Sequence, residues 1–271
     1  MDFTLILSLV FVVTVFIQLL YFLLIYRKLV FHEELQGEFK SPVSVVVCGY
    51  NEAENWKRLL PLLLEQDYAR FEIVVVNDQS TDNTKFVFNE WDWHPKLKVV
   101  TIDKHVKKSF GKKFALTLGI KAAQYDYLLL TDADCYPKDK EWISSMVQHF
   151  CKQKEIILGY GGYEKHTGIL NKLVRFDAFQ ISLQYLSYAL IGNSYMGVGR
   201  NLAYKKSLFF DNKGFASHIH IQSGDDDLFI KEVANSKNVA IAVNRSSHTL
   251  SIAKTTFSSW FRQKTRHLST S

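Results

Sequence analysis

The chain contains 271 residues, of which 47% are hydrophobic and 22% are charged, so it can bury a sizeable core and is neither disordered nor fibrous. Its 33 Lys and Arg residues outnumber its 27 Asp and Glu residues, and the net charge of +6 fits an anionic ligand or an anionic membrane face. The sequence has no basic stripe with interleaved aromatics, which argues against a nucleic-acid partner, and its three cysteines lack the spacing of a disulfide framework or a structural zinc site.

The first stretch of the chain is a candidate membrane helix. Residues 3–25 carry no charge, and at about 1.5 Å per residue they would cross a hydrocarbon core about 30 Å thick. A cleaved signal peptide would need a basic start, a shorter apolar core and a small-residue cleavage site. Arg27 and Lys28 follow the segment and no Lys or Arg precedes it. The positive-inside rule therefore predicts a protein anchored in the cell membrane, with the residues after the segment in the cytoplasm. The cysteine pattern, which indicates a reducing compartment, agrees.

From Pro42 onward, short apolar runs alternate with helix-length segments. The pattern predicts strands at 43–47, 71–76, 97–101 and from Tyr127, and helices at 52–65 and 112–123. Strands separated by helices imply right-handed crossovers and a mostly parallel sheet covered on both faces. The predicted fold class is therefore α/β, with a Rossmann-like nucleotide-binding half at 42–137. A membrane anchor at 1–28 and a short polar connector at 29–41 precede it.

The second half of the chain carries weaker patterns. Residues 142–150 and 169–191 are predicted to be helices and 156–159 a strand, and we interpret the long aromatic-rich helix as core packing. The glycine-bearing turn at 196–201 would permit close backbone approach to a donor sugar. Residues 257–268 mix aromatic and basic side chains, which suits either a helix in the membrane interface or an amphipathic helix packed on the domain.

Two carboxylates mark the end of the strand that begins at Tyr127. Asp132 and Asp134 follow its apolar run directly, and ligands of open α/β sheets bind at the carboxyl ends of the strands. Carboxylate oxygens two residues apart can hold a hard cation such as Mg²⁺ or Mn²⁺ together with a phosphate. An Asp-x-Asp sequence taken alone is equally a solvated turn or a helix cap.

Polar residues also follow the other predicted strands and would face the same crevice. Asp78 is placed to accept a hydrogen bond from a uracil N–H or a ribose hydroxyl, whereas Thr81 or Asp82 is interpreted as a helix N-cap. Five lysines surround Gly111, and they would either bind a diphosphate or form a solvated basic face. These lysines are Lys104, Lys107, Lys108, Lys112 and Lys113.

Six motifs in order resemble the membrane-anchored family 2 glycosyltransferases, over roughly residues 42–268. They are Gly-Tyr-Asn-Glu at 49–52, Asn-Asp-Gln-Ser-Thr-Asp at 77–82, Gly-Lys-Lys-Phe-Ala-Leu at 111–116, Thr-Asp-Ala-Asp at 131–134, Ser-Gly-Asp-Asp-Asp-Leu at 223–228 and Gln-Lys-Thr-Arg-His at 263–267. The resemblance implies a GT-A fold and transfer of a hexosyl or N-acetylhexosaminyl group from a nucleotide diphosphate donor, such as a UDP-sugar, with inversion. It also implies an acceptor-binding half at 138–255, and the mixed aromatic and basic composition near the end predicts an interfacial amphipathic helix at 256–271.

The resemblance also assigns roles to individual residues. It implies that Asp78 contacts the base or ribose, that Asp132 contacts the nucleotide and the metal, and that Asp134 is the principal metal ligand. The other implied donor contacts are Tyr50, Asn51, Glu52, Lys112, Gln263 and Arg266. The catalytic base would be a carboxylate in the acidic run, either Asp225 or Asp226, because the acceptor hydroxyl must lose a proton as it attacks.

Two positions depart from the family's usual motifs. Gly224 replaces a Glu, so the register of the acidic run favours Asp225 as the base but leaves Asp226 open. His267 replaces a Trp, which weakens the case for a processive polymer synthase. Family relatives often continue into further membrane helices, so the resemblance leaves open a longer chain beyond Ser271.

Two other functions fit parts of the pattern. A sugar nucleotidylyltransferase would also place carboxylates and lysines around a nucleotide, although it has no use for the acidic run or the membrane anchor. A catalytically silent membrane protein that binds a nucleotide sugar would keep the same fold. The sequence fixes neither the donor sugar nor the acceptor, which is expected to be a sugar, a lipid or a polysaccharide.

Overall fold

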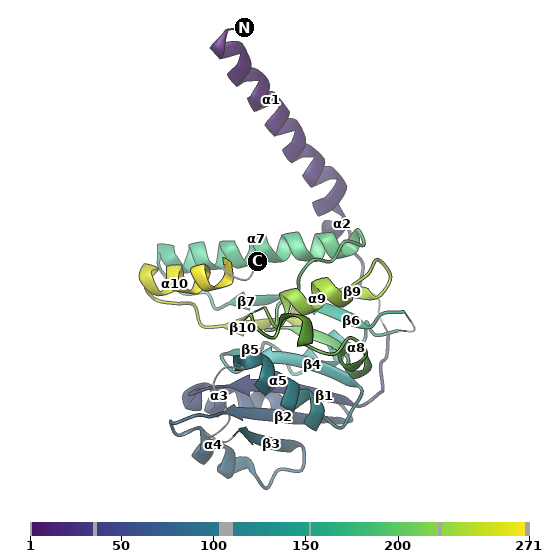
Figure 1. Ribbon diagram of the computed structural model, residues 1–271, viewed down its shortest axis with the longest axis vertical. Coiled ribbons are helices and arrows are strands. Elements are labelled where there is room, and N and C mark those ends of the chain that lie inside the picture. Colours follow the sequence, from purple (N-terminus) through teal and green to yellow (C-terminus); the bar gives the residue numbers. More distant parts are fainter. Residues whose placement is uncertain (1, 35–36, 103–110, 152, 222–223, 269–271) are drawn as a thin grey trace.

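The computed structural model describes residues 2–34, 37–102, 111–151, 153–221 and 224–268. A long helix at the N-terminus projects from an α/β body, and a second long helix lies across the face of the body from which it emerges (Figure 1). The body is built around a seven-stranded sheet and a three-stranded sheet.

The main sheet has seven strands in the order β3-β2-β1-β4-β8-β6-β9. These strands are β1 (Val43–Gly49), β2 (Phe71–Asp78), β3 (Leu97–Ile102), β4 (Tyr127–Asp132), β6 (Ile156–Gly159), β8 (Leu202–Lys205) and β9 (Val239–Ala242). Strands β1 to β4 are parallel, whereas β8 is antiparallel to both of its neighbours, β4 and β6. The mostly parallel α/β sheet expected from the sequence is confirmed, and the antiparallel insertion of β8 was not foreseen.

A smaller sheet of three short strands lies beside the end of β4. It consists of β5 (Cys135–Pro137), β10 (Thr249–Ser251) and β7 (Gly161–Tyr163), in the order β5-β10-β7. Because β5 begins three residues after β4 ends, the chain between the two sheets is the turn that carries Asp132 and Asp134.

Helices cover both faces of the main sheet. The helices of the body are α3 (Ala53–Leu64), α4 (Thr84–Trp91), α5 (Gly111–Ala122), α6 (Trp142–Val147), α7 (Ile169–Leu190), α8 (Lys206–Asp211), α9 (Asp227–Val233) and α10 (Phe257–Leu268). The predicted helix at 142–150 therefore ends at Val147, and the sequence did not single out α4 or α8.

Burial explains why the apolar runs form the central strands. All seven residues of β1 are buried, and a strand covered on both faces can be continuously apolar. Alternate side chains enter two cores: Val46 packs with α5, α9 and part of α7, whereas Val45 and Val47 pack with α3, α4 and α6. Gly119 lets α5 approach the sheet, because a Cβ there would lie 2.8 Å from the side chains of Val46 and Val76.

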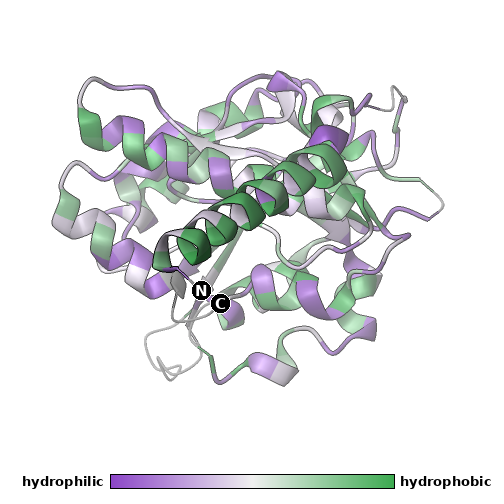
Figure 2. Ribbon diagram, turned by 90° about the horizontal axis from the view of Figure 1, so that it is seen from above, coloured by the Kyte–Doolittle hydropathy of each residue, from purple (hydrophilic) through white to green (hydrophobic). Residues whose placement is uncertain are grey.

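The N-terminal helix stands outside both cores. Residues from Phe3 to Val30 form one helical run, α1 (Phe3–Tyr21), a π-helical turn (Phe22–Tyr26) and α2 (Arg27–Val30), and it is long and apolar enough to cross a membrane. No residue of α1 is buried, and Figure 2 shows the helix as almost continuously hydrophobic. Such a surface is costly in water, so α1 needs an apolar environment.

The connector after α2 is fixed to the body. The carboxylate of Glu34 accepts hydrogen bonds from the backbone N–H groups of Val243 and Asn244, just after β9. Phe39 packs edge-on against Tyr127, with 4.7 Å between ring centroids. The helical run is therefore attached to the domain through specific contacts rather than through a free linker.

Candidate functional site

Three loops meet at the carboxyl ends of β1, β2 and β4. In the register of the sheet, Cys48 of β1 lies opposite both Val76 of β2 and Asp132 of β4. The loops that follow these strands therefore begin at the same level of the sheet edge, as the sequence suggested. Such an edge is where open α/β sheets bind their ligands.

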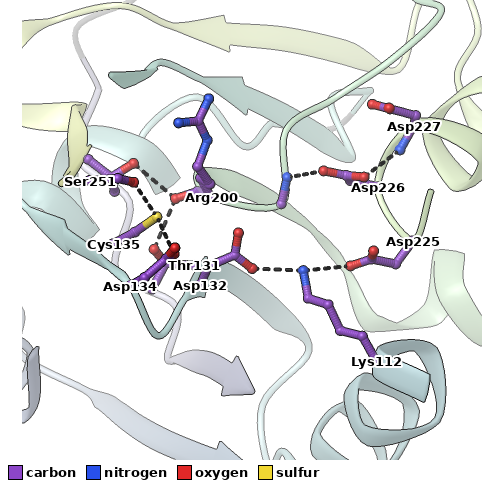
Figure 3. A network of polar contacts seen from close by, with 12 residues as sticks. Lys112, Thr131, Asp132, Asp134, Cys135, Arg200, Asp225, Asp226, Asp227 and Ser251 are labelled. Carbon is purple, nitrogen blue, oxygen red and sulfur yellow. Dashed lines mark hydrogen bonds and ion pairs between the residues drawn. The ribbon is translucent and has the colours of Figure 1, made fainter. Parts of the chain in front are cut away.

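One lysine joins an acid from this edge to an acid from the second half of the chain (Figure 3). The ammonium of Lys112, in the first turn of α5, lies 2.7 Å from Oδ1 of Asp132 and 2.9 Å from Oδ2 of Asp225. The side chain of Asp132 is 28% exposed and that of Asp225 is 10% exposed. The structure thus brings together three predicted site residues that lie far apart in the sequence.

The electrostatics of this cluster are those of a tight, partly desolvated ion network. Burial disfavours the charged form of Lys112, but attraction to Asp132, Asp225 and Asp226 outweighs it, so the pKa of Lys112 lies well above its usual value. Burial also acts to raise the pKa of Asp132, yet Lys112, with contributions from Arg200 and Arg266, lowers that pKa below its ordinary value. Both partners therefore stay charged at neutral pH.

Asp226 occupies a different position from Asp225. One of its oxygens accepts a hydrogen bond from the N–H of Gly199, and the other accepts from the N–H of Asp227 at the start of α9, 3.0 Å away. Burial and repulsion by Asp225 raise the pKa of Asp226 to about 6. The carboxylate of Asp226 thereby links the glycine-bearing turn to α9, and each of its oxygens already accepts a backbone hydrogen bond.

Asp227 is the least favourably placed of the three acids. Its Oδ1 atom is buried and has no hydrogen-bond partner among the described residues. Burial, with repulsion by Asp226 and Asp225, raises the pKa of Asp227 to about 8. This carboxyl group is therefore largely protonated near neutral pH.

The turn after β4 contains the candidate metal ligands. Ligand atoms of Asp132, Asp134 and Cys135 all lie within 4.8 Å of one another. The thiol of Cys135 is buried against the Ser251 hydroxyl at 2.8 Å, and burial raises its pKa well above the usual value. The two carboxylates fit a hard cation such as Mg²⁺ or Mn²⁺, whereas a protonated thiol does not.

The loops after β1 and β2 are locked to each other. Asn51, whose φ is +56°, accepts a hydrogen bond from the N–H of Thr81 at 2.7 Å. Asp82 accepts from the N–H of Ala53 at 3.0 Å and from the N–H of Thr84 at 3.1 Å, so it serves the first residues of both α3 and α4. Burial acts to raise the pKa of Asp82, but the hydrogen bonds from Thr84 and Ala53 together outweigh it, so the pKa lies below its ordinary value. Asp82 thus accepts hydrogen bonds at the helix starts as expected, although the N-cap position of α4 itself is Asn83.

The remaining predicted residues of this edge surround the locked loops. Asp78 ends β2, and burial raises its pKa. Tyr50 is 52% exposed, so its ring is free to contact a ligand. Glu52 is partly buried, which raises its pKa although Asn55 donates a hydrogen bond to it.

The basic cluster expected around Gly111 is only partly present. Lys113 is buried, and its ammonium donates to the backbone carbonyls of His218 at 2.8 Å and Ile221 at 3.0 Å. It therefore neither binds a ligand nor faces solvent, which corrects both interpretations made from the sequence. The expectation for Lys104, Lys107 and Lys108 lies outside the described residues.

Arg200 is a site residue that the sequence analysis did not single out. Its guanidinium lies over the ring of Tyr163, 4.9 Å from the centroid, and its buried Nη1 atom has no hydrogen-bond partner among the described residues. Burial opposes its charge, but Tyr163, Cys135 and Asp132 together raise the pKa of Arg200 above the usual value. The glycine-bearing turn marked this region, but nothing in the sequence indicated which way the arginine points.

The last predicted residues lie on α10. The amide of Gln263 is 3.5 Å from the hydroxyl of Tyr163, which places the helix against the Arg200 turn. Arg266 is exposed, and its charge contributes to the lowered pKa of Asp132. The C-terminal motif thus lies beside the same edge of the sheet.

Comparisons with known proteins agree on a family and a fold. The family model described as glycosyl transferase family 2 matches residues 44–210. Poly-beta-1,6-N-acetyl-D-glucosamine synthase of Staphylococcus epidermidis is 31% identical over 144 residues, which cover 52% of this chain and 32% of the relative. The enzyme of the same name from Staphylococcus aureus (strain COL) is 29% identical over 143 residues, with the same coverage. The match thus spans about a third of the length of these relatives.

Two solved structures share the GT-A type fold. The mannosyltransferase PcManGT from Pyrobaculum calidifontis, in complex with GDP-Man and Mn²⁺, superposes with a TM-score of 0.69 at 21% identity, covering 92% of this chain and 69% of that one. S. aureus TarS 1–349 in complex with UDP-GlcNAc gives a TM-score of 0.55 at 19% identity, covering 79% and 59%.

Proposed function

Because the chain belongs to glycosyl transferase family 2, we propose that it transfers a sugar from a nucleoside diphosphate donor to an acceptor hydroxyl where Lys112 joins Asp132 to Asp225. The contact of one ammonium with both carboxylates carries the proposal. It brings the acid at the nucleotide-binding edge and the acid of the second half into one place, as a reaction between a donor and an acceptor requires.

We assign the donor to the first half of the chain, 42–137, and the acceptor to the second, 138–255. In this assignment Asp78 would contact the base or ribose of the donor, and Tyr50, Asn51 and Glu52 would make the neighbouring donor contacts. UDP-N-acetylglucosamine is the first donor to test. The TarS structure is a complex with UDP-GlcNAc, and the relatives from staphylococci are poly-beta-1,6-N-acetyl-D-glucosamine synthases. GDP-mannose is the second donor to test, because the PcManGT structure is a complex with GDP-Man.

Cations at the site would stabilise the nucleoside diphosphate as it leaves the sugar. Breaking the bond between the sugar carbon and the diphosphate leaves negative charge on the leaving group, and a Mg²⁺ or Mn²⁺ ion held by Asp132 and Asp134 would stabilise that charge. The ammonium of Lys112 and the guanidinium of Arg200 provide fixed positive charge beside Asp132. Gln263 and Arg266 of α10 would contact the donor from the same side of the site.

Asp225 is the proposed general base. Transfer with inversion needs a carboxylate that takes the proton of the acceptor hydroxyl. Asp226 uses both oxygens in backbone hydrogen bonds and Asp227 is raised in pKa to about 8, whereas Asp225 has one oxygen on Lys112. These contacts favour Asp225 over its neighbours.

We further propose that α1 anchors the enzyme in the cell membrane with the body on the cytoplasmic side. The support is the length and apolar surface of the helical run together with Arg27 and Lys28 at its end. The acceptor is a sugar, a lipid or a polysaccharide. The replacement of the motif's Trp by His267 favours the addition of single sugars over processive synthesis.

The activity is tested with the full chain in phospholipid nanodiscs, incubated with Mn²⁺ and UDP-N-acetylglucosamine or GDP-mannose and a panel of acceptors. Acceptor-dependent release of nucleoside diphosphate, abolished by excess chelator, is the expected result. Pyrophosphate release from a nucleoside triphosphate would instead indicate a nucleotidylyltransferase. Donor binding without turnover on any acceptor would indicate a silent binding protein. Either result would contradict the proposal.

A further inference from the structure

The first turn of α5 carries two adjacent lysines that contact the same distant part of the chain. Lys112 contacts the carboxylate of Asp225 (Figure 3), and Lys113 donates to the backbone carbonyls of His218 at 2.8 Å and Ile221 at 3.0 Å. The proposed function uses Lys112 but assigns nothing to Lys113. Lys113 is nevertheless only 1% exposed, and a lysine is almost never buried so fully unless specific partners hold its ammonium.

The two carbonyls that Lys113 contacts belong to a turn that precedes the acidic run. Ile221 donates its backbone N–H to the carbonyl of His218 at 3.1 Å, so this carbonyl accepts both from the turn and from the lysine. Asp225 follows Ile221 by four residues, and Gly224, whose φ is +77°, stands directly before it. Lys113 therefore holds the backbone that leads into the acidic run.

The start of this segment is held by a different part of the molecule. Phe215 is buried, and its ring packs edge-on against that of Phe229 of α9, with 5.9 Å between the centroids. The hydroxyl of Ser217 donates to the carboxylate of Glu232, also on α9, at 2.7 Å. Both contacts attach the segment to the second half of the chain, whereas the bonds from Lys113 attach it to the first.

The charge of Lys113 also acts on the acidic run. Burial lowers the pKa of Lys113, while attraction to Asp225 and Asp226 acts to raise it. Burial and the nearby charge of Lys113 lower the pKa of His218, so this ring is neutral beside the ammonium. The ammonium thus attracts the two acids and at the same time holds the backbone before them.

We propose that Lys113 is a positioning residue, which holds the acidic run where Asp225 meets Lys112 and can reach an acceptor hydroxyl. This inference rests on the proposed role of Asp225 as the general base and adds the residue that fixes its place. Lys113 contacts backbone rather than substrate, so it acts through Asp225. Its loss would let the carboxylate move, and a displacement of about 1 Å can slow a reaction by about 10²-fold.

The test compares Lys113→Met with a matched control, both in the full chain in phospholipid nanodiscs. Methionine is unbranched and fills a similar space without an ammonium. Lys206→Met is the control, because the ammonium of Lys206 donates to the backbone carbonyl of Ala123, just after the other end of α5. Each variant therefore loses bonds from a lysine to the backbone, but at opposite ends of the helix. Lys113→Arg keeps a cation with N–H donors, and it takes the place of Lys113→Met in both measurements should the latter fail to fold.

The first measurement is backbone hydrogen exchange at residues 219–221 and 224–228. Exchange there is expected to be several-fold faster in Lys113→Met than in the wild type or in Lys206→Met, because the segment has lost its attachment to α5. Equal exchange in all three proteins would overturn the proposal, whether or not the chain is active. A wild type that performs no transfer would contradict the proposed function, and the exchange rates would still decide whether Lys113 holds the acidic run.

The second measurement is single-turnover transfer, with donor binding measured on the same samples. Lys113→Met should bind donor about as well as the wild type and transfer about 10²-fold more slowly, while Lys206→Met keeps the wild-type rate. In a chain that already carries Asp225→Asn, adding Lys113→Met should slow transfer by less than about threefold, because residues that act as one unit are not additive. Equal losses in the two backgrounds would show that Lys113 only stabilises the fold and would overturn the proposal. An unchanged transfer rate in Lys113→Met would overturn it as well.

Discussion

At the scale of single residues, the catalytic edge depends on how carboxylates share a small number of cations. Lys112 stays charged because two acids contact it, and Asp132 stays ionised because Lys112 contacts it. Asp134, by contrast, is exposed. Asp132 is therefore already paired with the ammonium of Lys112, whereas the exposed Asp134 is accessible to an added metal ion.

Asp134→Asn is expected to remove metal-dependent transfer while leaving the fold intact. An exposed residue at a strand end contributes within about 0.5 kcal/mol to stability, whereas loss of a group that stabilises the leaving charge costs about 10² to 10³-fold in rate. The measurement is the transfer rate as a function of Mn²⁺ concentration, with the thermal midpoint as the test of folding. The control is Asp126→Asn, an exposed acid just before the other end of β4. Full activity of Asp134→Asn in the presence of chelator would refute the metal assignment.

Asp227 gives the protein a pH-dependent instability. Its pKa in the folded chain is about 8 against an ordinary value of 3.8, so between these values the folded state binds a proton that the unfolded state has lost. Stability from this group is present at low pH and is lost as the pH rises toward 8. Asp227→Asn should therefore be more stable than the wild type near pH 8 by several kcal/mol, because every pKa unit between 3.8 and about 8 represents about 1.4 kcal/mol.

The prediction for Asp227 is checked by unfolding the two proteins in detergent across the pH range. The advantage of Asp227→Asn should shrink as the pH falls and disappear near the ordinary pKa of 3.8, where both states of the wild type are protonated. A difference in unfolding free energy that is independent of pH would show that Asp227 does not titrate in this way.

At the scale of elements, the loops of the edge are held by hydrogen bonds that run between helices. Asp82 accepts from the first residues of both α3 and α4, and Asn51 accepts from Thr81. The helices thereby fix the loops that follow β1 and β2. The position of Asp78 and Tyr50 relative to a nucleotide depends on this link.

Asp82→Ala should destabilise the chain by about 1 to 2 kcal/mol, the cost of losing an N-terminal helix cap. It should also weaken donor binding, because the two loops lose their common partner. Asp82→Asn keeps one acceptor oxygen and should lose less of both. Chemical denaturation and donor titration of the two variants provide the measurement, and equal losses in both variants would mean that the hydrogen bonds to Ala53 and Thr84 do not matter.

Much of the sheet could be predicted, because its strands are continuous apolar runs. β1, β2 and β3 begin at the expected residues and extend one or two residues further than expected. The order of β8 between β4 and β6 could not be predicted, because a four-residue run such as Leu202–Lys205 shows neither its partner nor its direction. The exposure of Ile169, Phe176 and Phe179 on α7 was missed for a related reason: an apolar composition does not show which side chains of a helix are buried.

The candidate site divides in the same way. The meeting of Asp78 and Asp132 at one edge follows from parallel strands, whose carboxyl ends lie together. The contact of Lys112 with Asp225 and the burial of Lys113 depend on how α5 and α9 pack, which no local pattern encodes. Adjacent lysines in one motif therefore have opposite surroundings.

At the scale of the whole molecule, the account predicts a fixed topology. Protease added to sealed vesicles with the cytoplasmic side inward should leave the body intact, because α1 is the span and Arg27 and Lys28 mark the cytoplasmic end. In inverted vesicles the body should be digested and the apolar helix protected. Fragments are followed with an antibody to the C-terminal region, and the reverse pattern would contradict the proposed orientation.

The measurement that tests the central claim most directly is single-turnover transfer by Asp225→Asn and Asp226→Asn, with donor binding measured on the same samples. If Asp225 is the base, Asp225→Asn should bind donor normally and lose transfer by about 10² to 10⁴-fold, the range for loss of general base catalysis. Asp226→Asn should keep most of its transfer, because the role of Asp226 is to hold the turn at Gly199. Near-normal transfer by Asp225→Asn would contradict the account, and a collapse confined to Asp226→Asn would move the base by one residue.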